Sequence, residues 1–255
     1  MGEATRSVDR ALDILLCFST NSPELSMTQI AERTSMNKST VHRLLATLEA
    51  KRFVERDHLT SLYRPGNRLL QMAFLTLERD DLRSVASPFL KSLNDLHRET
   101  ITLSIIDETD VVYIDVLESP QSVKMSARPG KRMPAYCTAS GKVIMAYSSE
   151  EVLGKIYAQG FTRYSPSTVT DPKVMEHILE LVRERGFAYS EEEFEEGINA
   201  VASPILDAKM QPLAAIAVAG PAYRLPVKRL LEIGPSIAEA ARHITAEYKI
   251  THLNR

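Results

Sequence analysis

A short run of hydrogen-bonding side chains, K-S-T-V-H-R at 38–43, could contact nucleic acid. On a helix, Ser39, His42 and Arg43 share one face, and that face lacks the Glu–Lys pairs of an ordinary solvated helix. Hydroxyl, imidazole and guanidinium groups can reach base edges in the major groove of a duplex. The same segment begins the helix, where side chains and free amides can both meet phosphate oxygens.

The opposite, apolar side of this helix would anchor it to a small domain. Its residues recur at the i, i+3, i+4, i+7 spacing of one stripe, formed by Val41, Leu44, Leu45 and Leu48. A shorter helix precedes it, with Ser26 as the expected N-cap, and residues 35–37 form the turn between the two. A first helix over 7–20 is expected to pack beneath them through Val8, Leu12, Leu15 and Leu16.

Two short strands around a polar turn, at 53–56 and 62–64, follow as a wing. Helix, turn, helix and hairpin in this order predict a winged helix-turn-helix domain over residues 1–66, which docks on double-stranded DNA in one defined way. A small helical domain that binds no nucleic acid is the alternative. The side chains that we expect to contact DNA are Thr28, Asn37, Lys38, Ser39, Thr40, His42, Arg43, Arg56 and Arg64.

The composition is that of a globular protein of about two domains. Residues 1–68 hold 10 Lys and Arg against 8 Asp and Glu, a net charge of +2, and the remainder holds 21 against 25, a net of −4. This asymmetry agrees with a DNA-facing N-terminal domain. The N-terminus lacks a signal-peptide core and no segment could span a bilayer, so we expect a cytoplasmic protein with no membrane partner.

Residues 67–83 indicate a linking helix that is apolar on nearly all sides. A helix exposed to water needs a polar face, so this one must be buried by more than its own domain. We therefore expect a homodimer, which would also supply two DNA-reading helices for half-sites about one turn of the duplex apart. The apolar residues are Leu69, Leu70, Met72, Ala73, Phe74, Leu75 and Leu77.

The remaining residues, 84–255, predict an α+β domain with an antiparallel sheet and flanking helices. Alternating residues predict strands at 101–105, 112–116, 122–127, 200–206 and 213–219. Helices are expected at 88–98, 138–147, 172–185 and 226–248, the last with a break at Gly234-Pro235. For the helix at 172–185 we expect Asp171 as N-cap, Gly186 as terminator, and a buried stripe of Val174, Ile178, Leu181 and Val182.

With these segments in order, the chain resembles the IclR family of bacterial transcriptional regulators over nearly its whole length. The resemblance lies in S-V-D-R-A-L-D-I-L, K-S-T-V-H-R-L-L-A-T-L and F-V-E-R, and then in C-T-A-S-G-K-V, G-F-A-Y-S-E-E-E-F-E-E-G-I-N-A-V-A-S-P-I-L-D and A-A-I-A-V-A-G-P. It implies a winged helix, a GAF-like effector domain, dimers that often pair into tetramers, and a small-molecule ligand that changes promoter binding, typically at a catabolic operon.

The resemblance also implies a ligand site near the start of the helix at 138–147. Where the founding pattern has Asp, Cys, Ser and Ser, this chain has one hydroxyl and three methyl groups, at Ser190, Ala200, Ala217 and Ala219. Such a site suits an aromatic or longer-chain carboxylate better than glyoxylate, with free amides of the helix start holding the carboxylate. The expected effector-binding residues are Val123, Met125, Tyr136, Cys137, Ala139, Ser140, Ser190, Ala200, Ala217 and Ala219.

Other chemistry finds little support in the residues. Cys137 has no His near it in sequence, although a base from elsewhere stays open, and we expect no catalytic residue. Cys17 is expected to be a buried packing residue. The acidic run 191–196 lacks His partners, so we expect no metal and no cofactor, and we leave any ligand role of the run open. His97, His177 and His243 lie singly on helices, which is typical of surface or packing residues.

Three function classes remain in view. The first is a DNA-binding regulator that responds to a ligand. The second is a constitutive DNA-binding dimer whose C-terminal domain binds nothing, and the third is an enzyme with a DNA-targeting module. The third would need a convergent acid, base or metal set within 84–255, which the sequence lacks. The sequence leaves the effector, the operator and the sign of regulation open.

Overall fold

The computed structural model describes residues 5–19, 22–72 and 81–253. The chain forms two compact units, Met1–Asp80 and Asp81–Arg255, and each has its own apolar core. The division between the units lies inside the segment 67–83 that the sequence assigns to a linker. Among the described residues, no helix combines the length and the apolar character that crossing a bilayer would need.

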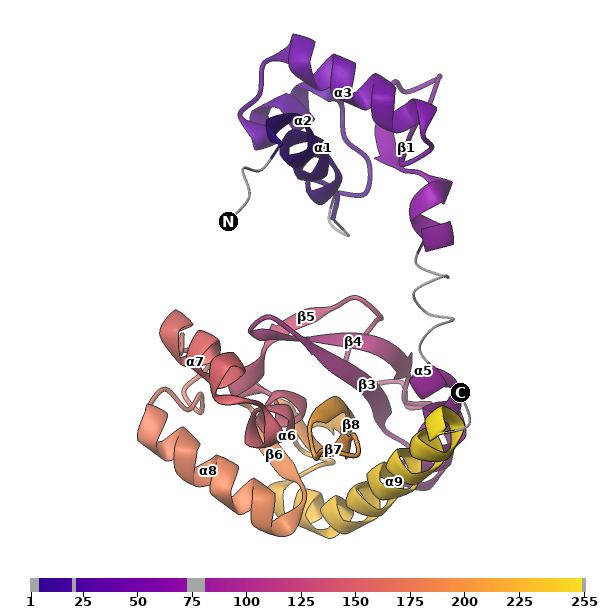
Figure 1. Cartoon of the computed structure of the whole chain (residues 1–255). Helices are drawn as coiled ribbons and strands as arrows, with labels where there is room; N and C mark the ends of the chain where they lie inside the picture. The colour runs from indigo at the N-terminus through magenta and orange to yellow at the C-terminus, as the bar shows by residue number, and fades with distance from the viewer. Residues whose placement is uncertain (1–4, 20–21, 73–80, 254–255) are drawn as a thin grey trace. The chain divides into compact units, whose positions relative to one another are not determined.

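The N-terminal unit is a helix-turn-helix followed by a small hairpin (Figure 1). Its second helix begins with a capping box: Ser26 accepts from the Gln29 amide at 3.3 Å, and the Gln29 side chain accepts from the Ser26 amide at 2.8 Å. Ser35, in the left-handed region at φ 52°, ends that helix. The elements are α1 (Arg6–Leu16), α2 (Met27–Thr34), α3 (Lys38–Ala50), β1 (Val54–Arg56) and β2 (Tyr63–Pro65).

Helix α3 buries the expected side. Val41, Leu45 and Leu48 lie in the core of this unit with Ile30 and Val54. The strands β1 and β2 pair antiparallel. On its other edge, β2 is tied to the segment before α2, where the Tyr63 and Leu25 backbones exchange hydrogen bonds. The apolar stripe, the capping residue and the hairpin that the sequence predicts are therefore confirmed.

Helix α1 differs from the expectation in both its end and its buried face. It ends at Leu16 instead of residue 20, and Ile14 is its fully buried residue. Val8, Leu12 and Leu16 are 57%, 52% and 80% exposed, so the prediction that they pack beneath the other helices is wrong. The physical reason is that Ile14 fills the core, while Val8 and Leu12 border an open hollow of about 410 Å³ that the half-buried Leu44 also lines.

The linking segment is described only in part. Residues 67–72 are helical, as expected, and the expected apolar residues Ala73, Phe74, Leu75 and Leu77 lie outside the described residues. Helix α5 (Asp81–His97) begins seven residues before the expected start at 88 and contains Pro88 in its interior. The proline removes the hydrogen bond to the carbonyl of Ser84. Ser84 is exposed, so water can satisfy that carbonyl.

The C-terminal unit is built on a six-stranded antiparallel sheet in the order β5-β4-β3-β8-β7-β6. Helices α5 and α9 cover one face and α6 and α8 the other, with an apolar core in each layer (Figure 1). The α+β prediction is confirmed. The strands are β3 (Thr100–Asp107), β4 (Asp110–Leu117), β5 (Arg132–Pro134), β6 (Ala188–Glu191), β7 (Ile198–Leu206) and β8 (Pro212–Pro221). The helices are η1 (Ala135–Cys137), α6 (Ala139–Tyr147), α7 (Glu150–Gln159), α8 (Pro172–Arg185) and α9 (Val227–Leu253).

The expected strand at 122–127 is absent. Met125 and Ala127 are buried between exposed neighbours, which gives the alternation seen in the sequence, but the backbone pairs with no strand. The edge of β4 pairs with β5 instead, where Val112 lies opposite Arg132. Alternating apolar and polar residues indicate which side chains turn inward. They do not indicate whether the edge of a neighbouring strand is free to pair with the segment.

Helices α8 and α9 also differ from what the sequence predicts. Asp171 caps α8 and Gly186 ends it at φ 80°, as expected, but the buried residues are Met175, Leu179 and Val182. Val174 and Leu181 are 48% and 38% exposed, because α8 packs against α6 through a face rotated from the predicted one. Helix α9 runs unbroken through Pro235, curving along the sheet, with buried Ile233 and Ile237 on either side of the proline (Figure 1).

Candidate functional site

The outer face of α3 is open to solvent. Ser39, His42, Arg43 and Ala46 are all exposed, opposite the buried stripe that anchors the helix. We call these four residues the recognition face. No described residue of the N-terminal unit covers them, so the imidazole and guanidinium groups, and the Ser39 hydroxyl as an acceptor, are available to a base edge. Exposure alone does not show contact with DNA, and the role of each residue stays a prediction.

The N-terminus of α3 has the features of an anion site. The Asn37 side chain caps the helix, accepting from the Thr40 amide at 2.9 Å and from the Ser39 hydroxyl at 3.0 Å. Lys38 is exposed next to this cap, and Thr28 is exposed in the first turn of α2. A phosphate here would meet an ammonium group and the positive end of the helix dipole.

The two wing arginines are engaged with neighbours on the hairpin. Arg56 donates to the Ser61 hydroxyl at 3.2 Å, and Arg64 pairs with Glu55 at 3.4 Å. Both arginines are exposed, and exposed pairs contribute only about 0–1 kcal/mol. A DNA phosphate can therefore compete for either guanidinium at little cost in free energy.

The second candidate site is a cavity between the sheet and the start of α6, which we call the α6 cavity. Strand register explains why it forms: Ser190 pairs with Ala200, Ala200 with Ala219, and Ala217 with Thr102. Small side chains on adjacent strands leave room beneath the helix. The cavity has a volume of about 50 Å³ and is lined by Thr102, Tyr113, Met125, Lys131, Met133, Cys137, Thr138, Ala139, Ser140, Ser190, Phe194, Glu195, Ile198, Ala200, Ala217 and Ala219.

Eight of the ten residues expected at a ligand site line this cavity, and two do not. Val123 is 60% exposed, and its carbonyl accepts from Arg224 at 2.8 Å, which holds this part of the loop away from the cavity. Tyr136 stacks on Phe161 with ring centroids 4.5 Å apart and donates its hydroxyl to the Thr162 carbonyl at 2.8 Å. It therefore packs outside the cavity. Neither Val123 nor Tyr136 lines the cavity as expected, and a contact of either residue with an effector stays a prediction.

The sequence reasoning missed several lining residues, among them Thr102, Tyr113, Lys131, Phe194 and Glu195. Thr102 lies on β3 directly opposite Ala217. Pairing the alternating runs 101–105 and 213–219 would have found it. No comparable signal marks Phe194 and Glu195, which sit in an irregular segment between β6 and β7.

The start of α6 contributes uncharged polar groups to the cavity. Thr138 caps α6 by accepting from the Gly141 amide at 3.1 Å, which leaves the amides of Ala139 and Ser140 at the helix start. Burial, and next the charge of Glu193, raise the pKa of the Cys137 thiol to about 12. Burial also raises the pKa of Tyr113. A thiol held protonated at neutral pH is a poor nucleophile.

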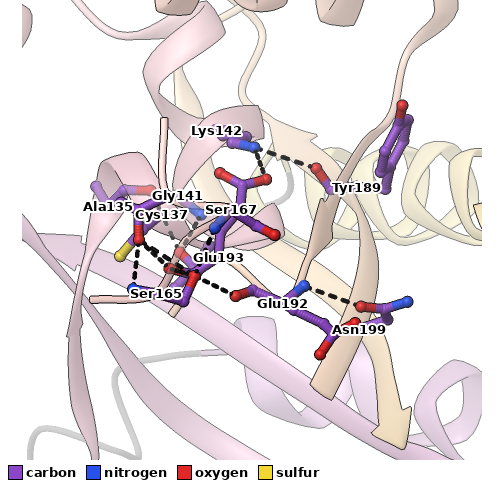
Figure 2. Close-up of polar contacts among 12 residues, drawn as sticks. Ala135, Cys137, Gly141, Lys142, Ser165, Ser167, Tyr189, Glu192, Glu193 and Asn199 are labelled. Atoms are coloured by element: carbon purple, nitrogen blue, oxygen red, sulfur yellow. Dashed lines mark hydrogen bonds and ion pairs between the residues drawn. The ribbon is translucent and has the colours of Figure 1, made fainter. Parts of the chain in front are cut away.

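One glutamate of the acidic run 191–196 is the partner of a buried lysine. Glu193 is buried and pairs with Lys142 of α6, which also donates to the Tyr189 carbonyl at 3.3 Å (Figure 2). The other glutamates of the run are exposed or half-buried. In the part of the chain that the structure describes, no group of three or more His, Cys, Asp or Glu could hold a metal ion.

Cys17 and the three single histidines on helices are packing or surface residues. Cys17 is half-buried, less than expected. His97 is half-buried and bonded to Ser236 at 3.2 Å, while His177 and His243 are exposed. None of these residues lines the α6 cavity.

Comparison with known proteins decides the family. The model for the IclR helix-turn-helix domain matches residues 7–58, and that for the bacterial transcriptional regulator IclR C-terminal domain matches residues 74–246. The chain belongs to the IclR family. It is therefore a DNA-binding transcriptional regulator with an effector-binding C-terminal domain, and the family's members are regulators, not enzymes.

Individual relatives agree with this membership. The HTH-type transcriptional regulator BhcR of Paracoccus denitrificans is 32% identical over 94% of this chain and 86% of its own length. The crystal structure of the Thermotoga maritima IclR protein superimposes with a TM-score of 0.75 at 32% identity, covering 94% of this chain and 98% of that one. An IclR homologue from Microbacterium hydrocarbonoxydans, solved in complex with 4-hydroxybenzoate, has a TM-score of 0.83 at 24% identity and covers 94% and 98%.

Proposed function

We propose that this regulator binds an operator through α3 and that a small organic carboxylate in the α6 cavity changes that binding. The observation that carries the proposal is the convergence of Ala200, Ala217 and Ala219 from two strands beneath the N-terminus of α6. The methyl groups offer an apolar floor, and the helix start offers amides to a carboxylate. Control of a catabolic operon is the setting we infer, since organic acids are products of catabolism.

The volume of the cavity limits the ligand. About 50 Å³ is well below the roughly 150 Å³ cavity that holds benzene. In the described conformation the cavity admits a small acid, so an aromatic acid requires its wall to move outward. The relative that was solved with 4-hydroxybenzoate supports aromatic acids as a class to test, and the alanine floor favours them over glyoxylate.

The DNA contacts that we propose follow from exposure and chemistry. Ser39, His42 and Arg43 would read bases from the recognition face, while Thr28, Asn37, Lys38, Thr40, Arg56 and Arg64 would hold the backbone. Because bacterial DNA lies in the cytoplasm, we infer that the protein works there.

We also propose a homodimer, or a dimer of dimers. Support comes from the N-terminal unit, where Val8, Leu12, Leu16 and Leu70 are all at least half exposed although each is a large apolar side chain. Soluble proteins cover such surface with a partner, and a second copy would also bring a second α3 for a paired half-site.

The proposal is tested by titrating DNA that flanks the protein's own gene, labelled with a fluorophore, with the full-length chain. The titration is repeated with pyruvate, benzoate, 4-hydroxybenzoate and a six-carbon sugar acid. We expect at least one acid to change the dissociation constant for DNA about five- to 150-fold. Tight DNA binding that no acid changes would favour the alternative, a constitutive DNA-binding dimer with a ligand-free C-terminal domain.

A further inference from the structure

One wall of the α6 cavity is an irregular segment, residues 192–197 between β6 and β7, which we call the wall loop. Phe194 and Glu195 of this loop line the cavity, and Ile198 follows them at the start of β7. The preceding residue, Glu193, does not line the α6 cavity; its side chain is buried and pairs with Lys142 of α6. The position of Glu193 therefore sets where Phe194 stands in the wall.

Two kinds of contact hold the start of the wall loop. The Ser165 hydroxyl donates to the Glu192 carbonyl at 2.6 Å, and the Thr168 hydroxyl donates to the Glu193 carbonyl at 2.6 Å. Lys142 of α6 holds the Glu193 side chain (Figure 2). The backbone is thus fixed from one side and the side chain from the other, which leaves the segment little freedom to rotate.

A contribution to folding stability does not by itself explain the Lys142–Glu193 pair. The two side chains are 2% and 7% exposed, and burying two ions is costly unless every polar atom finds a partner. Among the described residues, Glu193 Oε2 is buried without a hydrogen-bond partner. Well-packed apolar residues would commonly fold as well, whereas a charged pair fixes one geometry more strictly.

Lys142 also connects the wall to the helix that begins the site. It lies within about one turn of Thr138, Ala139 and Ser140, which line the α6 cavity. The pair therefore connects two parts of the proposed site. One is the start of α6, where we place the carboxylate, and the other is the wall loop, which must move for a larger ligand.

We propose that the buried Lys142–Glu193 ion pair sets the size of the α6 cavity by fixing the wall loop, so that both residues determine which carboxylates bind. The inference rests on the proposed effector site. Lys142 and Glu193 are positioning residues that act through Phe194 and Glu195. With the pair intact, the wall restricts the entry of aromatic acids, and loss of the pair lets the wall move outward and relaxes that restriction.

The test replaces the pair with apolar residues of similar volume, in the full-length double variant Lys142→Met/Glu193→Leu. Lys155→Met/Glu151→Leu is the matched control, because it makes the same changes in an exposed pair on α7. Hydrogen exchange without ligand is the first measurement. We expect peptides covering 192–197 to exchange faster in the double variant, with no change there in the control. Exchange at the wild-type rate would overturn the inference.

Calorimetric titration with pyruvate and with 4-hydroxybenzoate is the second measurement. We expect the ratio of the two affinities to shift about tenfold or more toward the aromatic acid in the double variant. An unchanged ratio in a folded variant would also overturn the inference, since a purely structural pair predicts that result. If the wild-type protein binds neither acid, the effector-site proposal fails, and the exchange rates still decide whether the pair holds the loop.

A milder variant provides the test if the double variant does not fold. In Glu193→Gln the amide oxygen can still accept from Lys142, but the ionic attraction is lost. If the double variant does not fold, we expect Glu193→Gln to exchange faster than the wild type over 192–197. Equal exchange in this variant would overturn the inference as well.

Discussion

The recognition face shows how residue types on one helix can be assigned before any complex is known. Ser39, His42 and Arg43 occupy exposed positions that an ordinary helix would fill with Glu and Lys pairs. Among them, Arg43 has the guanidinium fork that pairs with guanine in the major groove. It is therefore the residue of this face from which we expect the largest contribution to specificity.

Replacing Arg43 with Ala should weaken specific operator binding by roughly 1–3 kcal/mol, because a bidentate contact to a base is lost. Non-specific binding should change much less. Fluorescence anisotropy with operator and scrambled DNA separates the two effects. Arg242→Ala, which removes an exposed arginine from α9, serves as the control. Equal losses on both DNAs would instead assign Arg43 to the phosphate backbone.

The floor of the α6 cavity provides a second residue-scale prediction. In Ala217→Ser/Ala219→Ser, two hydroxyls enter the floor, and each hydrogen bond to a polar ligand contributes roughly 0.5–1.5 kcal/mol. We expect calorimetry to show tighter pyruvate binding and weaker 4-hydroxybenzoate binding. Ala208→Ser, in the exposed turn between β7 and β8, should change neither. A variant in which both acids bind as before would remove the alanines from the ligand site.

At the scale of elements, helix contacts decide how stability responds to pH. His97 of α5 bonds to Ser236 of α9 at 3.2 Å, and burial, then the charge of Arg229, lower its pKa. The folded state thus favours the neutral imidazole, while the unfolded chain takes up a proton near pH 6.5. Stability from this group is present above that pH and is lost as the pH falls below it.

We therefore expect the free energy of unfolding to fall between pH 7.5 and pH 5.5, and to fall less in His97→Gln. The half-buried imidazole is partly screened by water, so its share should stay below about 1 kcal/mol. Urea denaturation at the two pH values measures it. The exposed His177→Gln should behave as the wild type. Identical pH dependence in His97→Gln would show that His97 is not the group responsible.

How far the elements could be predicted depended on what surrounds each of them. The α3 stripe and the caps Ser26, Asp171 and Gly186 depend on local spacing, and the structure has them as expected. The buried faces of α1 and α8 depend on which neighbour arrives, and Val8 and Val174 turned outward. Local periodicity does not contain that information.

The residues of the candidate site likewise divide into those that the sequence could predict and those that it could not. Ala200, Ala217 and Ala219 line the cavity because strand register brings them together, and the family pattern already carries that register. Val123 and Tyr136 lie outside the cavity because their positions depend on Arg224 and Phe161, which lie far from them in sequence. The Lys142–Glu193 pair joins a helix to a loop and has no sequence signature of its own.

At the scale of the whole molecule, the exposed apolar residues of the N-terminal unit predict self-association. Leu12→Glu/Leu70→Glu should weaken the dimer, since each leucine that is no longer buried costs roughly 1.5–3 kcal/mol and each carboxylate opposes burial. Light scattering after gel filtration should show a shift toward monomer. Leu59→Glu, in the hairpin turn and 97% exposed, should leave the mass unchanged. A dimer that persists at micromolar concentration in the double variant would refute this interface.

The proposed control of operator binding by a carboxylate makes a reciprocal demand, because linkage is symmetric for binding free energies. A carboxylate that weakens operator binding must itself bind more weakly to the operator complex. Neither the α6 cavity nor the recognition face alone produces this behaviour, so it tests the molecule as one system.

We would therefore measure the affinity of the most effective carboxylate by calorimetry, once with the free protein and once with the protein saturated by operator DNA. We predict that DNA changes the carboxylate affinity by the same factor, about five- to 150-fold, by which the carboxylate changes the DNA affinity. A carboxylate that binds the free protein and the DNA complex equally well would contradict a ligand-controlled regulator.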